Sequence, residues 1–265
     1  MYNSFQLTKK FFHYYLTASN GKGHGIHSPF VFEFITNILN DKKQYDCYDK
    51  IEVRRKILRK DPQEITVEDF GAGSAVIKAN KRKVAAIAAS SLKPKKFAQL
   101  LFRMVNYYRP QTIVELGTSF GITTAYLASA NAGAKIFTFE GATAIAGIAQ
   151  QNFNELGLKN IELVTGDFTQ TLPSALSRLN EVDLAFIDGN HRKVHTLDYF
   201  YQLTNHSSPS TILVFDDIHW SKEMEEAWEQ VKHAPGVTLT IDLFFTGIVF
   251  FNTDIKIPQH FRIRF

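Results

Sequence analysis

After Pro110 the sequence alternates short apolar runs with helical stretches, and this alternation restricts the possible folds more than any other feature of the chain. Five apolar runs read as buried strands: residues 112–117, 135–140, 161–167, 182–189 and 211–217. A segment with helical character follows each of them. This pattern is typical of a parallel sheet covered by helices on both faces.

The end of the chain departs from the alternation. Residues 237–251, "VTLTIDLFFTGIVFF", read as two strands joined by a short turn, which makes the pair antiparallel. The sequence therefore predicts an α/β fold with a doubly wound, mostly parallel sheet of seven strands whose last strand is reversed. Before Pro110 the patterns are mostly helical. We predict a basic helical N-terminal region over 1–108, serving as a lid or as a substrate or partner surface, and a sheet domain over 109–265.

Composition narrows the class of protein. Of the 265 residues, 45% are hydrophobic and 21% are charged, as in globular proteins. The chain lacks an apolar run of the roughly 20 residues that a membrane span needs, and its start lacks the apolar core of a signal peptide. Cys47 is the single cysteine, which excludes an intramolecular disulfide and a cysteine-cluster metal site. A cytoplasmic location is expected.

Charge is distributed unevenly along the chain. Residues 1–110 hold 20 Lys and Arg against 9 Asp and Glu, whereas the remaining residues hold 10 against 17. The basic half could face an anionic substrate, RNA, a membrane surface or the acidic half of the same chain. An ordinary solvated basic surface explains the pattern equally well.

Two glycine-containing stretches compete for the role of a nucleotide-binding loop: "EDFGAGS" at 68–74 and "VELGTSFGITTAYLA" at 114–128. Such a loop needs a buried strand before it and a helix after it, so that backbone N–H groups point at the ligand. The second stretch meets both conditions, and the next strand ends in Glu140, which could accept both ribose hydroxyls. Ser119 stands where a dinucleotide-binding motif requires glycine, which disfavours a pyrophosphate ligand.

The stretch "VELGTSFGITT" resembles the first motif of S-adenosylmethionine-dependent methyltransferases with a Rossmann-like fold. The similarity is greatest to the catechol and caffeoyl-CoA O-methyltransferases and their bacterial relatives, and it covers about Ile113 to Phe251. It implies S-adenosyl-L-methionine as cofactor, O-methylation of a small-molecule hydroxyl as activity, and a reversed last strand. The residues that the resemblance assigns to cofactor binding are Glu115, Gly117, Thr118, Ser119, Gly121, Thr123, Glu140, Asp167 and Asp188.

The resemblance also gives several of these residues separate roles. Glu115 and Gly117 are expected beside the methionine portion of the cofactor, and Thr123 is expected to cap the following helix. Glu140 is expected to bind the ribose, and Asp167 to lie near the adenine amino group. Taken singly, Glu115 and Asp167 could also be ordinary acids at strand ends.

Three aspartates follow consecutive predicted strands: Asp188 after the fourth, and Asp216 and Asp217 after the fifth. Because the carboxyl ends of parallel strands meet at one edge of a sheet, the three carboxylates are expected to converge. Unpaired carboxylates repel one another, so such a site would attract Mg²⁺, Mn²⁺ or Ca²⁺. The resembled enzymes hold Mg²⁺ with Asp, Asp and Asn, and Asp217 here replaces that Asn. Alternatively, Asp217 turns away and pairs with a neighbour such as His219, and no metal binds.

Two histidines are candidates for the catalytic base. Asp188 is expected to take part in catalysis together with them. Members of the resembled family often carry a lysine where this chain has His191, and histidine can serve as a base near neutral pH. His219 is the second candidate. Either residue could instead be a helix cap or a surface histidine.

The glycine-rich segment at 20–30 and the polar segment at 68–83 interrupt the helical half. They are candidate lid hinges or anion-contacting loops, or ordinary loops between helices. Two other functions stay open: a methyltransferase acting on RNA through the basic half, and a non-catalytic cofactor-binding scaffold. A homodimer is also compatible with the sequence, which does not identify the methyl acceptor.

Overall fold

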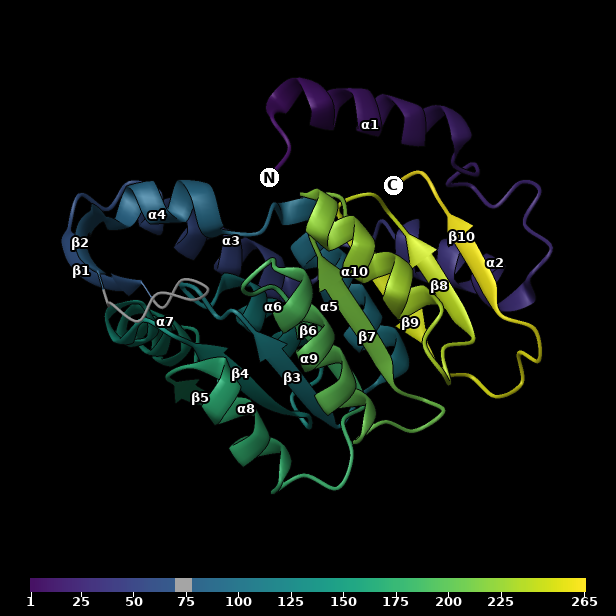
Figure 1. Cartoon of the computed structure of the whole chain (residues 1–265). Helices are drawn as coiled ribbons and strands as arrows, with labels where there is room; N and C mark the ends of the chain where they lie inside the picture. Colours follow the sequence, from purple (N-terminus) through teal and green to yellow (C-terminus); the bar gives the residue numbers. More distant parts are fainter. Residues whose placement is uncertain (70–77) are drawn as a thin grey trace. The chain divides into compact units, whose positions relative to one another are not determined.

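The computed structural model describes residues 1–69 and 78–265 (Figure 1). The chain divides into two compact units. One consists of Met1–Asp41 together with Leu179–Phe265, which we call the terminal unit, and the other consists of Lys42–Arg178, the central unit. The predicted division after residue 108 coincides with neither boundary and stays a prediction.

The main sheet has eight strands in the order β10-β8-β9-β7-β6-β3-β4-β5. Within the terminal unit, β9 is antiparallel to both of its neighbours, β7 and β8. The predicted α/β fold with a mostly parallel sheet and a reversed strand is confirmed. One further strand, β10, pairs in parallel with β8 and extends the sheet beyond the seven predicted strands.

In the central unit three parallel strands form the part of the sheet that precedes the candidate cofactor site. They are β3 (Thr112–Leu116), β4 (Lys135–Glu140) and β5 (Ile161–Thr165). The inner residues of β3 and β4 are buried, as the near-continuous apolar runs indicated. The helices that follow the three strands are α6 (Ile122–Ala130), α7 (Thr143–Glu155) and α8 (Phe168–Leu176).

The first part of the central unit is helical with one hairpin. Its helices are α3 (Asp46–Leu58), α4 (Val84–Ser91) and α5 (Lys95–Tyr108). Strand β1 (Glu64–Asp69) pairs antiparallel with β2 (Lys78–Lys83), so 78–83 is a strand and not the loop that we expected. The glycines of "EDFGAGS" lie outside the described residues, so the structure leaves the expectation of a hinge there untested.

The terminal unit carries the other five strands of the main sheet. They are β6 (Leu184–Ile187), β7 (Ile212–Asp216), β8 (Leu239–Asp242), β9 (Thr246–Phe250) and β10 (Gln259–Arg262). Helices α9 (Lys193–Thr204) and α10 (Lys222–Lys232) lie side by side (Figure 1). Large aromatic side chains such as Phe186, Phe200 and Phe215 fill the interior between the strands and helices.

The N-terminal segment of this unit comprises α1 (Ser4–Thr17), α2 (Pro29–Phe34) and a π-helical turn, η1 (Ile35–Leu39). The predicted helix start at Ser28-Pro29 is confirmed, because the Ser28 side chain accepts a hydrogen bond from the Val31 N–H at 3.5 Å. Helix α1 packs through Tyr14, whose ring centroid lies 5.3 Å from that of Phe244. None of the helices in the described residues is long and apolar enough to cross a membrane.

Candidate cofactor and acceptor sites

The loop after β3 is fixed to the neighbouring strand β4. The N–H groups of Gly117 and Thr118 both donate to the carbonyl oxygen of Phe139, at 3.0 and 2.9 Å. Gly121 has φ of 77°, and a Cβ added there would lie 2.4 Å from the Phe153 ring of α7. Glycine is therefore required at 121 both for its left-handed backbone and for the close approach of the aromatic ring.

Glu140, the last residue of β4, has its carboxylate oriented by two backbone amides. The N–H of Ser119 donates to its Oε2 at 2.8 Å, and the N–H of Ala142 donates to its Oε1 at 3.0 Å. Burial raises the pKa of Glu140, although the backbone amides oppose this shift. Ser119 has φ of 49°, which is uncommon outside glycine. The loop thus adopts a strained conformation that directs an amide at this carboxylate.

Glu115 is fully buried within β3 and connects this strand to the loop and to β4 through hydroxyl groups. Its Oε2 accepts hydrogen bonds from the hydroxyls of Thr138, at 2.6 Å, and Thr124. Thr138 also lies 2.6 Å, oxygen to oxygen, from the hydroxyl of Thr118. Sequence reasoning missed both Thr124 and Thr138, although a threonine inside the apolar run "KIFTFE" was an available signal. The role of Glu115 beside the methionine portion stays a prediction.

Two predicted roles at helix starts have different outcomes. The prediction that Thr123 caps α6 is wrong, because the cap is Gly121, which lies two residues earlier and has no capping side chain. Asp167 caps α8, and its Oδ1 accepts hydrogen bonds from the N–H and the hydroxyl of Thr169, both at 2.9 Å. This is the ordinary structural role that we considered for Asp167, and its contact with adenine stays a prediction.

Asp188, Asp216 and Asp217 lie in the terminal unit at neighbouring strand ends. Ile187 pairs with Phe215 in the parallel β6–β7 ladder, so the residues that follow them are adjacent, as predicted. However, the described residues contain no group of three or more His, Cys, Asp or Glu side chains placed to hold a metal ion. Asp216 is 5% exposed, and the next residue, Asp217, has a left-handed backbone with φ of 53°. The structure therefore does not bring the three carboxylates together as the cation site that we expected.

His191 lies close to Asp188. Its Nε2 is 3.6 Å from Asp188 Oδ1, and the two side chains are 32% and 19% exposed. Between them, Asn190 has φ of 66°, which turns the chain after β6 and brings the two side chains together. A histidine beside a carboxylate, with part of its ring open to solvent, can accept a proton and be stabilised as the cation.

His219 occupies a different environment. Its Nδ1 is 3.1 Å from Glu225 Oε1, its Nε2 is 2.9 Å from Asp242 Oδ2, and the Phe244 ring stacks on it at 5.1 Å between centroids. Burial alone would lower the pKa of His219, but the two carboxylates outweigh this effect and raise it. With both ring nitrogens occupied, His219 bridges α10 and β8 and is poorly suited to act as a free base.

The glycine loop after β3 and the acidic end of β4 lie within a segment that a known protein family also contains. Residues 114–218 match a family model described as a methyltransferase domain. The chain therefore carries a methyltransferase domain, and the resemblance indicated by the sequence is confirmed. A search of curated proteins finds no match to the chain.

Solved structures share the fold at low sequence identity. An O-methyltransferase from Bacillus cereus in complex with SAH has 19% identity and a TM-score of 0.56, over 83% of this chain and 97% of that chain. The SAH-bound Podospora anserina methyltransferase PaMTH1 has 12% identity and a TM-score of 0.59, over 84% and 96%. The O-methyltransferase TomG from Streptomyces achromogenes, involved in tomaymycin synthesis and in complex with SAM, has 19% identity and a TM-score of 0.52, over 60% and 82%.

Proposed function

We propose that this chain is an S-adenosylmethionine-dependent methyltransferase that acts on a hydroxyl group of a small molecule. The observation that carries the proposal is the Glu140 carboxylate, oriented by the amides of Ser119 and Ala142 at the carboxyl end of β4. Each carboxylate oxygen has acceptor capacity beyond the one amide that it binds. The pair of oxygens can therefore accept hydrogen bonds from the two adjacent hydroxyls of a ribose.

The rest of the cofactor is assigned to the loop that precedes Glu140. In the proposed complex, Gly117, Thr118 and Ser119 lie along the cofactor, with Gly121 and Thr123 at the start of α6, and Asp167 lies near the adenine. When bound, S-adenosylmethionine supplies an electrophilic methyl group attached to a positively charged sulfur. The acidic residues Glu115 and Glu140 suit a ligand of that charge.

The protein's part in the transfer is to remove the hydroxyl proton of the acceptor. We assign this step to His191, which would take the proton from the acceptor oxygen on its exposed ring edge. Asp188, 3.6 Å from the ring, would stabilise the resulting imidazolium. General-base catalysis of this kind contributes on the order of 10²- to 10⁴-fold to a rate.

The resemblance also implied that Mg²⁺ assists the transfer, with Asp188, Asp216 and Asp217 as its ligands. The described side chains do not form a ligand cluster of that kind, and no step assigned above depends on a cation. We expect methyl transfer to persist in EDTA. Activity that disappears in EDTA and returns with Mg²⁺ would contradict this expectation and restore the aspartates to the role of ligands.

The experiment is a methyl-transfer screen with labelled S-adenosylmethionine and a panel of small phenols and catechols, followed by variants on the best acceptor. His191→Gln should lower kcat by roughly 10²-fold or more while leaving S-adenosylhomocysteine affinity nearly unchanged. His206→Gln, in the same unit just after α9, is the matched control and should leave kcat unchanged. Full activity of His191→Gln would remove His191 from the mechanism. Absence of transfer to every hydroxyl compound would contradict the proposed acceptor class.

A further inference from the structure

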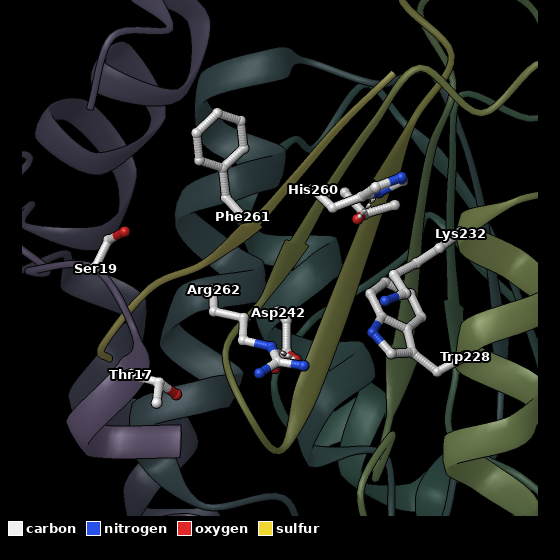
Figure 2. A pocket seen from close by; sticks show the side chains of 9 residues that line it. Thr17, Ser19, Trp228, Lys232, Asp242, His260, Phe261 and Arg262 are labelled. Atoms are coloured by element: carbon white, nitrogen blue, oxygen red, sulfur yellow. Dashed lines mark hydrogen bonds and ion pairs between the residues drawn. The ribbon is translucent and has the colours of Figure 1, made fainter. Parts of the chain in front are cut away.

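The terminal unit contains a cavity of about 380 Å³ that none of the roles above uses (Figure 2). Its floor is the edge of the sheet, where Thr240 and Asp242 of β8 lie opposite His260 and Arg262 of β10. Helix α10 forms one wall, and the chain just after α1 forms another. A volume of this size lies within the roughly 300–1,000 Å³ range of small-molecule sites.

Trp228 of α10 contributes a buried donor to this cavity. The residue is 3% exposed, and within the described part of the chain its indole N–H has no hydrogen-bond partner. In Figure 2 the nitrogen of the indole lies on the edge that faces Asp242 and Arg262. The ring can take this position because residue 247 is glycine: a Cβ there would lie 2.7 Å from the indole Cη2. A buried donor without a partner is unfavourable, so an acceptor atom in the cavity would be favoured.

Two cationic side chains line the same cavity. Lys232 is on the same face of α10 as Trp228, four residues later, and its side chain is 15% exposed. Its Nζ lies 2.7 Å from Oε1 of Glu229, which is not among the residues that line the cavity, so the other N–H groups of the ammonium are the donors offered to a ligand. Arg262 projects from β10 and is 49% exposed, with its Nε 3.7 Å from Asp242 Oδ2. Within residues 1–69 and 78–265 this is the one ion pair found for Arg262, and a guanidinium carries five N–H donors.

The one carboxylate on the floor is already bound within the protein. Asp242 Oδ2 lies 2.9 Å from His219 Nε2, and its Oδ1 accepts the Phe244 N–H at 2.8 Å. Asp242 therefore adds little net negative charge, and the other two charged residues that line the cavity, Lys232 and Arg262, are cations. His260 completes the polar floor, with its Nδ1 2.9 Å from the Thr240 hydroxyl. Burial, together with the neighbouring Lys232 and His233, lowers the pKa of His260.

We propose that this cavity binds a small molecule through an oxyanion group, a carboxylate or a phosphate, with oxygens that accept from the Trp228 indole N–H, Lys232 and Arg262. Charge-assisted hydrogen bonds to such groups are short and strong, and a guanidinium suits both kinds of oxyanion. The site shares no residue with those assigned above to cofactor binding or proton transfer. Its test is therefore independent of the proposed methyl transfer.

The test is calorimetric titration of the full chain with two probes, inorganic phosphate and benzoate. Wild-type protein should show saturable binding of at least one probe, and the probe that binds more tightly identifies the anion class. Lys232→Gln and Arg262→Gln should each weaken binding at least tenfold. Lys222→Gln removes a cation from the same helix at a side chain that is 82% exposed, and it should leave binding unchanged.

Trp228→Phe tests the indole N–H separately, because phenylalanine keeps an aromatic ring in the same position and loses only the donor and part of the ring volume. We expect several-fold weaker binding with an unchanged circular dichroism spectrum. Absence of saturable binding by wild-type protein would overturn the proposal. Equal weakening in Lys222→Gln would also overturn it, since it would show that the probes bind only through general surface charge.

Discussion

Gly121 and Ser119 both have left-handed backbones, and the two residues meet different needs. Gly121 allows the Phe153 ring to contact the loop, and Ser119 directs its N–H at Glu140. A serine in this conformation stores strain that the surrounding structure must offset. Such strain is often found at functional sites, which agrees with the cofactor role proposed for this loop.

Gly121→Ala is expected to destabilise the protein, because its Cβ would overlap the Phe153 ring and the left-handed backbone disfavours alanine. We expect a loss of about 1–3 kcal/mol in the free energy of unfolding, measured by urea denaturation. Gly147→Ala in α7 is the control, since a Cβ there meets nothing within 4 Å. Replacing this helical glycine with alanine should raise the free energy of unfolding by about 0.5–1 kcal/mol. Equal stability of the two variants would contradict this account of the loop.

Single residues differ in how far the sequence predicts them. Glu140 could be identified because it ends a buried strand just after the glycine loop. The contacts of His219 could not, because Glu225 and Asp242 belong to other elements and only the fold brings them to its ring. The same limit explains the error at Thr123: the cap is set by the left-handed backbone of Gly121, which the letters "GITT" do not reveal.

At the scale of elements, His219 connects three parts of the terminal unit. Its ring joins Glu225 of α10 to Asp242 of β8, and Glu225 also binds Lys10 of α1 at 2.9 Å and Tyr2 at 2.7 Å. Arg262 of β10 lies on the other side, 3.7 Å from Asp242. Hydrogen bonds from Tyr2, Lys10 and His219 outweigh the effect of burial and lower the pKa of Glu225.

This cluster should make stability depend on pH. The pKa of His219 is raised above 6.5, so its stabilising contribution is complete below pH 6.5 and is lost as pH rises through the folded-state pKa. Glu225, with its pKa lowered below 4.5, contributes above pH 4.5 and loses this contribution as pH falls through its folded-state value. The cluster is therefore strongest between these two limits.

We expect His219→Gln to be less stable than wild type by roughly 1.5–3 kcal/mol near pH 5.5, as for hydrogen bonds to charged groups. The difference should shrink toward pH 9. Urea denaturation of both proteins across this pH range measures it, and His206→Gln serves as the control variant. A difference that does not change with pH would show that His219 contributes only through packing.

Most elements could be predicted because apolar runs mark buried strands. Strands β3 to β9 all coincide with such runs. Strand β2 and the edge strand β10 were missed, because segments such as "KANKRK" and "QHFR" carry too few apolar residues for a buried strand. Segment 20–30 was a candidate hinge, but it begins where the chain is held to the C-terminal end: the Arg264 N–H donates to the Ser19 carbonyl at 3.0 Å.

At the scale of the whole molecule, the excess of Lys and Arg in residues 1–110 leaves RNA as an alternative partner. We expect only weak, non-specific RNA binding, with Kd on the order of 10⁻⁴–10⁻⁶ M at physiological salt, as is typical of contacts with phosphates alone. Such binding depends on salt because each phosphate contact releases a counterion. Fluorescence anisotropy with a labelled single-stranded RNA at 50 and 200 mM salt measures it, and the affinity should fall steeply between the two. Tight binding of one defined RNA would instead favour methylation of RNA.

The central claim is that the loop after β3 and Glu140 bind S-adenosylmethionine, and calorimetry with S-adenosylhomocysteine tests it most directly. Wild-type protein should bind, and Glu140→Ala should bind at least about 10- to 100-fold more weakly, since the loss of even one hydrogen bond to a charged group costs roughly 1.5–3 kcal/mol. Glu162→Ala removes a carboxylate from β5 that pairs with Lys135 and Arg178, and it should bind as wild type does. No binding by the wild-type protein, or equal affinity of Glu140→Ala and wild type, would contradict the account.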